Sequence, residues 1–534
     1  MFKKTKIAAA TVALLSAAAM QNASAVAIDD SGTNAQVLIF PYYNTNNGFA
    51  TGFAVRNTTG ATKAVKFRFR ESKLSNDVLD FNVYLSPYDR VSFGLTVNAA
   101  GQASIATNDT TCIHPAIVGS VPLKGNVYKA TKDADGREGY LEVIEMGVVD
   151  PNATVTGAGP SGTSTVKIVD GIKHTTASVP FDCSVIAKAW AQGKFTPGGA
   201  NSVLGGVNDI GRTPLNISAP TGGLQGWSFL LDFDNGNAFV AMPAAIRNYQ
   251  SGVHGQHYRS SDAAAFLLPS LASGDSTTSV VMNNAGTASI STAWNTTADY
   301  AATPTGAKEV VLGNGNAGPA SSGINPLPMA HVLAATGFSN DYNVTATTNA
   351  GTDWVITFPM RKHGIFSNVA YTTPTTFDGP TDSDVKISGS SAFYNSEEQT
   401  AAVSDDFSPV STSPSELLPR EVNVLSFGKT GGTVLKVLNS SFFKNYGVSY
   451  NEGWGNVVFG LQTVPASLGL PTATTTVPGT PETVITNAFT AKSKGVPVIG
   501  FAAFRGEFGA GGKVNSISES VPHVFTRDTA PVNQ

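Results

Sequence analysis

Residues 65–70 alternate strictly between apolar and basic side chains. The apolar positions are Val65, Phe67 and Phe69, and the basic positions are Lys66, Arg68 and Arg70. Residues 79–86 repeat the alternation, with Asp, Asn, Tyr and Ser at the intervening positions. A period of two with aromatic and β-branched residues indicates strands that bury one face. We therefore expect an early β-sheet on which the basic residues form a solvated face.

Short strands separated by turn residues continue along most of the chain, so we predict a mainly β fold. Four strands within the first hundred residues favour immunoglobulin-like β-sandwich domains, with long Gly/Ser/Thr-rich loops and one short helix near 181–193, capped by Asp182. Asn235-Gly236 between two apolar runs predicts a hairpin over Trp227–Met242. Later strands are expected at Asp341–Thr347, Trp354–Pro359, Val422–Phe427, Val434–Leu438, Val457–Leu461 and Val496–Phe504.

The composition shifts suggest how the chain is divided. We expect a signal peptide at 1–25, an N-terminal β-sandwich domain at 26–300, a Pro/Gly-rich linker at 301–329, a C-terminal β domain at 330–520 and a frayed tail at 521–534.

The first 25 residues have the pattern of an export signal. Lys3, Lys4 and Lys6 precede an apolar run, and Ala23-Ser24-Ala25 supplies the small residues at a cleavage site. The run is too short to remain as a membrane anchor, and no later apolar stretch predicts a transmembrane helix. We expect a mature protein that is exported to the cell surface or beyond, with the periplasm as an alternative.

Charged residues make up only 13% of the chain, about half of the usual share. The net charge is −4, and it becomes −7 when the three lysines of the signal are removed. A basic face for nucleic acid is therefore not expected. The 41% apolar content argues against a disordered chain. The charge that is missing has been replaced by Gly, Ala, Ser, Thr and Asn.

Cys112 and Cys183 are the only cysteines. An even number of cysteines in an exported chain predicts a disulfide. In the loop-entropy model, closing the loop between these two cysteines stabilises the folded state by roughly 4 kcal/mol. Two buried free thiols are the alternative. Neither cysteine has the CxxC spacing of a zinc or haem site.

No motif gives a convincing catalytic site. The chain has neither the GxSxG elbow of a serine hydrolase nor the HExxH of a metalloprotease. The paired carboxylates of glycoside hydrolysis are defined by their separation in space, so the sequence does not decide whether the chain has such a pair. No cofactor is predicted, apart from calcium as a weak alternative.

Two groups of residues remain as candidate binding positions. Asp133, Asp135 and Glu138 place three carboxylates in one predicted turn, where calcium could bind, although a solvated turn is the favoured interpretation. Tyr42 and Tyr43 follow Pro41 and form the aromatic pair that we expect to be most exposed, as a possible binding surface.

Several segments resemble exported proteins of Gram-negative bacteria that are described as cell surface proteins. The segments are Val37 to Tyr43, Phe53 to Thr59, Lys63 to Glu71, Leu79 to Asp89, Trp354 to Pro359 and Gly495 to Ala503. The resemblance implies a surface location, and it implies no catalytic residues.

Three functions follow as hypotheses. The first is a structural protein of the cell surface that self-assembles as an S-layer-like or filament subunit, with copies of itself or other envelope components as partners. The second is a secreted binding protein or adhesin that recognises a glycan or a surface. The third is a polysaccharide-active enzyme on a β scaffold. Few lysines guard the apolar strands, which is compatible with edges covered by partners.

Overall fold

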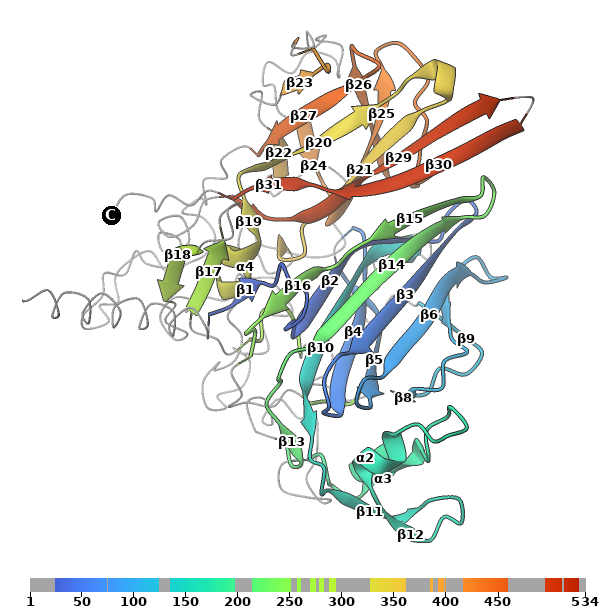
Figure 1. The fold of residues 1–534 in the computed structure, drawn as a ribbon, viewed down its shortest axis with the longest axis vertical. Helices are drawn as coiled ribbons and strands as arrows, with labels where there is room; N and C mark the ends of the chain where they lie inside the picture. The colour runs from blue at the N-terminus through green and yellow to red at the C-terminus, as the bar shows by residue number, and fades with distance from the viewer. Residues whose placement is uncertain are drawn as a thin grey trace, which may run out of the picture.

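The computed structural model describes most of the two β-rich regions of the chain. The described residues are 25–73, 75–123, 135–196, 214–250, 257–260, 269–274, 278–282, 288–293, 327–361, 385–387, 392–397, 399, 416–459, 495–510 and 513–527. They form mainly antiparallel sheets with few helices, which confirms the mainly β prediction (Figure 1). The immunoglobulin-like type of sandwich stays a prediction.

The first sandwich contains an eight-stranded sheet and a six-stranded sheet. The eight-stranded sheet has the order β1-β16-β2-β10-β4-β5-β8, with β13 paired to β10. Its strands are β1 (Ala27–Ile28), β2 (Val37–Asn44), β4 (Lys63–Glu71), β5 (Asp77–Leu85), β8 (Cys112–His114), β10 (Glu138–Val149), β13 (Ile217–Ser218) and β16 (Ala244–Arg247). A short 3₁₀ turn, η1 (Asp135–Arg137), leads into β10.

The six-stranded sheet packs against one face of the eight-stranded sheet. Its order is β15-β14-β3-β6-β7-β9. The strands are β3 (Phe49–Asn57), β6 (Arg90–Val97), β7 (Ala103–Ala106), β9 (Ser120–Pro122), β14 (Leu224–Asp232) and β15 (Asn237–Ala241). The apolar positions of the alternating strands meet here as predicted: the Phe67 and Phe81 rings stack 5.5 Å apart, and Phe93 meets Phe67 edge-on at 5.4 Å.

The second sandwich is built from residues after 333. A five-stranded sheet, β26-β25-β21-β29-β30, faces a four-stranded sheet, β23-β27-β20-β31. The strands are β20 (Gly337–Asn343), β21 (Gly351–Thr357), β23 (Ala392–Tyr394), β25 (Val422–Lys429), β26 (Phe443–Val448), β27 (Glu452–Val458), β29 (Ile499–Ala510), β30 (Lys513–Pro522) and β31 (Val524–Thr526). Trp354 is fully buried between the sheets, and its indole Nε1 donates to Asp341 O at 2.9 Å.

The remaining short elements lie beside the two sandwiches. They are β11 (Thr154–Ala158), β12 (Ser164–Lys167), β17 (Thr278–Met282), β18 (Ala288–Ala293), β19 (Ala334–Ala335), β22 (Val385–Ile387), β24 (Glu416–Leu418), β28 (Val496–Pro497), η5 (Ala346–Thr348) and helices α2 (Ile168–Ile172), α3 (Ser184–Ala191) and α4 (Leu327–Leu333).

The two sandwiches are packed together over a shared apolar core. Val37 and Ile39, on the second face of β2, belong to the same buried cluster as Val355 and Phe501 of the five-stranded sheet. At one side β15 runs next to β30 (Figure 1), where the Ser518 hydroxyl donates to Ala238 O at 2.8 Å. The eight-stranded sheet is therefore covered on both faces, and this placement controls what its charged residues do.

The predicted helix and disulfide are both present. Helix α3 is shorter than expected, and the Asp182 carboxylate accepts from Ser184 N at 2.9 Å at its start. Cys112 and Cys183 are bonded, with Cα atoms 5.3 Å apart, so the bridge ties α3 to β8. The described part contains α2 and α4 as well, so the expectation of one helix was too low.

Several sequence-based bounds were wrong. The strand expected at Asp341–Thr347 is β20, which begins earlier and ends at Asn343. Val434–Leu438 is not a strand, and the side chains of Asn44 and Asp353 bind the backbone of Leu438. β2 continues through Pro41 to Asn44, because Pro41 lies where the register with β10 shifts and no ladder N–H is required. The end of the chain is not frayed from 521, because β30 and β31 continue to Thr526.

Other predictions lie outside what the structure describes. Of the predicted signal peptide at 1–25, only Ala25 is among the described residues. Of the predicted linker at 301–329, only residues 327–329 are described. The division at 26–300 and 330–520 stays a prediction. In the described part, no helix has the length and hydropathy needed to cross a bilayer.

Candidate functional site

The basic row of β4 is buried, and the expectation of a solvated face was wrong. Lys66, Arg68 and Arg70 are each 0% exposed. They lie on the face of the eight-stranded sheet opposite the phenylalanine core, and this face is covered by chain from elsewhere. Tyr258 O accepts from the Asn82 amide on that face at 2.7 Å, and Val422 N donates to Ser72 O at 3.0 Å at the end of β4.

Each buried basic side chain of this row has an acidic partner on a neighbouring strand. Ion pairs join Lys66 Nζ to Asp80 Oδ2 at 2.8 Å, Arg68 Nε to Asp77 Oδ2 at 3.2 Å, and Arg70 Nε to Glu142 Oε1 at 3.3 Å. Burial lowers the pKa of the Lys66 ammonium, and the Asp80 carboxylate opposes that effect. The row is electrically balanced and inaccessible, so it holds layers together and is not a ligand site.

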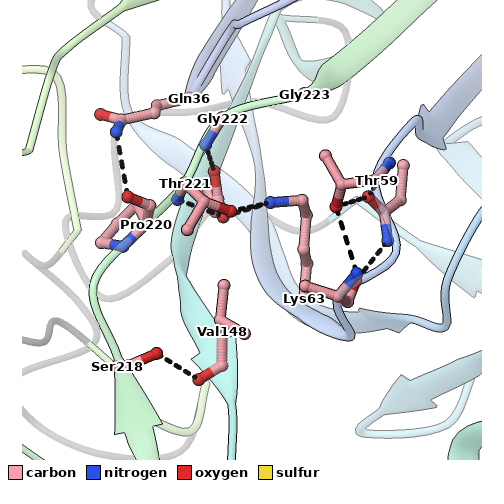
Figure 2. Close-up of polar contacts among 12 residues, drawn as sticks. Gln36, Thr59, Lys63, Val148, Ser218, Pro220, Thr221, Gly222 and Gly223 are labelled. Carbon is pink, nitrogen blue, oxygen red and sulfur yellow. Dashed lines mark hydrogen bonds and ion pairs between the residues drawn. The ribbon is translucent and has the colours of Figure 1, made fainter.

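A fourth buried pair closes one end of the first sandwich (Figure 2). Lys63 Nζ lies 2.6 Å from Glu145 Oε1 and 2.8 Å from the Thr221 hydroxyl. Glu145 also accepts from the backbone N–H groups of Thr221 at 3.0 Å and Gly222 at 2.8 Å. Burial raises the pKa of the Glu145 carboxyl, although Lys63 and the backbone donors act in the opposite direction. The pair fixes the connection between β13 and β14 to the sheet.

Glu138 is the centre of a polar network between the two sandwiches. Its carboxylate accepts from Tyr42 OH at 2.9 Å, Asn46 Nδ2 at 2.6 Å, Ser440 Oγ at 2.7 Å and Ser441 N at 2.6 Å. The first two donors belong to the first sandwich and the last two to the second. Burial raises the pKa of this carboxyl, against the effect of its donors.

Asp353 extends this network into the five-stranded sheet. Leu438 N donates to Asp353 Oδ2 at 2.7 Å, and Asn44 Nδ2 donates to Leu438 O at 2.6 Å. Asp353 is 0% exposed, and burial raises its pKa to about 7. Glu138 and Asp353 are enclosed by the two sandwiches, so a polysaccharide chain cannot reach them as it reaches the carboxylates of a glycosidase.

The candidate binding aromatics are buried, contrary to the expectation that they are exposed. Tyr42 and Tyr43 are both 0% exposed, and Tyr43 OH donates to Gly136 O at 3.2 Å. Burial raises the pKa of both phenols well above its ordinary value. Tyr42 contributes to the interface between the sandwiches and does not form a surface for a ligand.

The calcium candidates are not brought together in the described part of the chain. Asp133 lies outside the described residues, as does the side chain of Asp135. Glu138 lies on β10, where four protein donors already occupy its carboxylate. Among the described residues, no group of three or more His, Cys, Asp or Glu side chains is placed to hold a metal.

The accessible surface with the most distinctive chemistry is the outer face of the six-stranded sheet. Trp227 and Phe229 on β14 are half-buried there. The Arg56 and Arg90 guanidinium carbons lie 5.6 and 5.5 Å from the Trp227 ring centre, within cation–π range. A Cβ added to Gly52 would approach Phe229 Cδ2 within 2.7 Å, so the ring lies directly on the strand.

Exposed apolar side chains extend this face from β14 onto β15. Val240 on β15 is 50% exposed, and Met242 beyond it is 59% exposed. Arg56 and Arg90 are exposed, and neither forms an ion pair with a residue that the structure describes. The sequence predicted the hairpin that carries this face, but the pairing of β14 with β3 joins residues more than a hundred positions apart.

Comparison of the chain with protein-family models, with curated proteins and with solved structures finds no match.

Proposed function

We propose that this chain is an exported structural protein of the bacterial cell surface, and that copies of it associate through the outer face of the six-stranded sheet. The observation that carries the proposal is the exposed apolar strip beside Trp227, with Val240 and Met242 at its margin. Large exposed apolar patches on soluble proteins commonly mark sites of association.

The surrounding charges favour a second copy as the occupant. Trp227 lies between two arginines that have no carboxylate partner in the described part, whereas the whole chain is net acidic. Aromatic residues and arginine are enriched at protein–protein contacts. An acidic surface of a neighbouring copy would pair with Arg56 and Arg90 while its apolar groups cover Val240.

The rigid connection between the sandwiches also supports a structural role. The network through Glu138, the buried ion pairs and the Cys112–Cys183 disulfide hold the layers together. A subunit of a lattice or filament needs such a body, because its geometry must repeat from copy to copy. The resemblance to cell surface proteins agrees with this location. A secreted binding protein is the alternative.

Sedimentation velocity and negative-stain electron microscopy of the purified protein test the proposal. The wild-type chain is expected to form concentration-dependent assemblies. Val240→Lys should weaken them, because it places a charge within the exposed apolar strip that the second copy is proposed to cover. The matched control is Val118→Lys, which changes an 80% exposed valine in the connection between β8 and β9.

Two results would count against the proposal. One is a wild-type protein that remains a monomer at every concentration tested. The other is an equal loss of assembly in Val240→Lys and Val118→Lys, since a general increase in positive charge would then explain the effect.

A further inference from the structure

The outer face of the four-stranded sheet carries a second exposed aromatic surface, on the other sandwich. Trp454 on β27 is 42% exposed and stacks on Tyr394 of β23, with ring centres 4.4 Å apart and an angle of 19° between the planes. Asp341 of β20 pairs with Trp454 from the side opposite Tyr394. One face of the indole is therefore taken by Tyr394, and its other face is turned toward the strand that carries Asp341.

Polar side chains surround this indole. Alternation along β20 and β27 places Ser339, Asp341, Glu452 and Asn456 on the same outer face as Trp454, whereas Phe338 and Val457 enter the core. None of these four polar side chains forms a hydrogen bond or ion pair with the part of the chain that the structure describes. Their carboxylate, amide and hydroxyl groups remain available to a ligand.

We propose that this face binds a neutral glycan. A sugar ring can lie with its C–H groups on the free face of Trp454, while adjacent sugar hydroxyls donate to the Asp341 carboxylate and exchange hydrogen bonds with Asn456 and Ser339. Such sites combine an apolar wall with a few polar groups that fix orientation. The two carboxylates disfavour an acidic polysaccharide, because like charges would be brought together.

A second copy of the chain is the competing occupant, and the observations favour the sugar. An aromatic wall beside carboxylate, amide and hydroxyl groups is suited to the many hydroxyls of a polysaccharide. The apolar side chains that a protein contact would cover lie instead on the six-stranded sheet, around Val240 and Met242. The glycan site is independent of the self-association proposed above, since the two use different sheets.

Affinity electrophoresis through gels that contain xyloglucan, galactomannan, dextran or pullulan tests the inference, with alginate as the acidic comparison. At least one neutral polysaccharide should retard the wild-type protein. Trp454→Ala should weaken that binding by about tenfold or more, as truncation of a tryptophan at the centre of a contact commonly does. Trp227→Ala is the matched control, because it removes a tryptophan from the other sheet, and Val240→Lys should bind as the wild type does.

Asp341→Asn provides a second variant that leaves no cavity at an exposed position. It should keep the unfolding midpoint of the wild type and bind the retarding polysaccharide more weakly. The inference is overturned if no neutral polysaccharide retards the protein, if alginate retards it equally, or if both Trp454→Ala and Asp341→Asn bind as the wild type does. Loss of assembly with unchanged glycan binding in these two variants would assign the face to a second copy.

Discussion

Replacing Asp353 with asparagine should remove the loss of folding stability that this carboxyl group causes as the pH rises. Asp353 is fully buried at the contact between the sandwiches, and burial raises its pKa to about 7. An aspartate in an unfolded chain has a pKa of about 3.9. The native protein therefore keeps a proton over a pH range in which the unfolded chain has released it.

The sign follows from this difference in bound protons. The Asp353 contribution favours the native state most below about pH 4 and is lost as the pH rises toward 7. A difference of about three pKa units corresponds to about 4 kcal/mol at most. Asparagine keeps the shape and can still accept from Leu438 N, but it does not ionise.

Two buried histidines contribute with the opposite sign. Burial lowers the pKa of His257 and of His523 to about 3. Below about pH 6.5 these two histidines are therefore protonated in the unfolded chain but remain neutral in the native protein. Stability from these two groups is lost as the pH falls. The wild-type profile mixes both effects, and the difference between wild type and Asp353→Asn isolates the carboxyl group.

Urea unfolding followed by far-UV circular dichroism, at steps between about pH 4.5 and about pH 8.5, measures this difference. As the pH rises over this range, the unfolding free energy of the variant should increase by several kcal/mol relative to that of the wild type. An amide N–H without a partner would lower the stability of the variant by about 1–3 kcal/mol, but it would do so equally at every pH. Asp341→Asn, at an exposed position of the same sandwich, is the control. Parallel profiles for wild type and Asp353→Asn would refute the reasoning.

Two further predictions concern the covalent and ionic ties. Replacing Cys112 and Cys183 together with serine should lower the unfolding free energy by about 4 kcal/mol relative to the oxidised wild type, the value for a loop closed over 71 residues. Thermal unfolding measures the loss, and the reduced wild type should match the variant. Lys63→Met should cost about 3–5 kcal/mol because Glu145 is left charged and buried. The pair Lys63→Met with Glu145→Gln should recover part of that loss, and equal destabilisation of both variants would show that the charge of Glu145 is not the cause.

The sequence was informative where one face of a strand meets one core. The phenylalanines of β4 and β5, the hairpin of β14 and β15, helix α3 and the disulfide follow from local patterns or from counting. Period-two alternation identifies the strands and their core face because both are decided within a few residues. These features needed no knowledge of distant parts of the chain.

The sequence failed where a third layer decides the outcome. Lys66, Arg68 and Arg70 have the pattern of a solvated face, and they are buried because chain from around Tyr258 and Val422 covers them. The acidic partners on β5 and β10 were a usable signal, since a face with complementary charges across three strands can be buried without leaving a charge unpaired.

The same limit explains the polar interface. Local sequence predicts Tyr42 as an exposed aromatic residue and Glu138 as a carboxylate in a turn. In the structure they contact each other, and Glu138 also contacts Ser440, 302 residues later in the chain. The segment 434–438 has the residues of a strand, yet Asn44 and Asp353 bind the backbone of Leu438 in place of a neighbouring strand. No local pattern contains these contacts.

Fractionation of the native cells tests most directly our proposal that the chain is a structural protein of the cell surface. Surface material would be separated from periplasm and medium, the chain quantified in each fraction, and the surface fraction imaged by electron microscopy. We predict that the chain is among the abundant proteins of the surface fraction and lies in regular assemblies. Recovery only as a dilute, soluble monomer would contradict it.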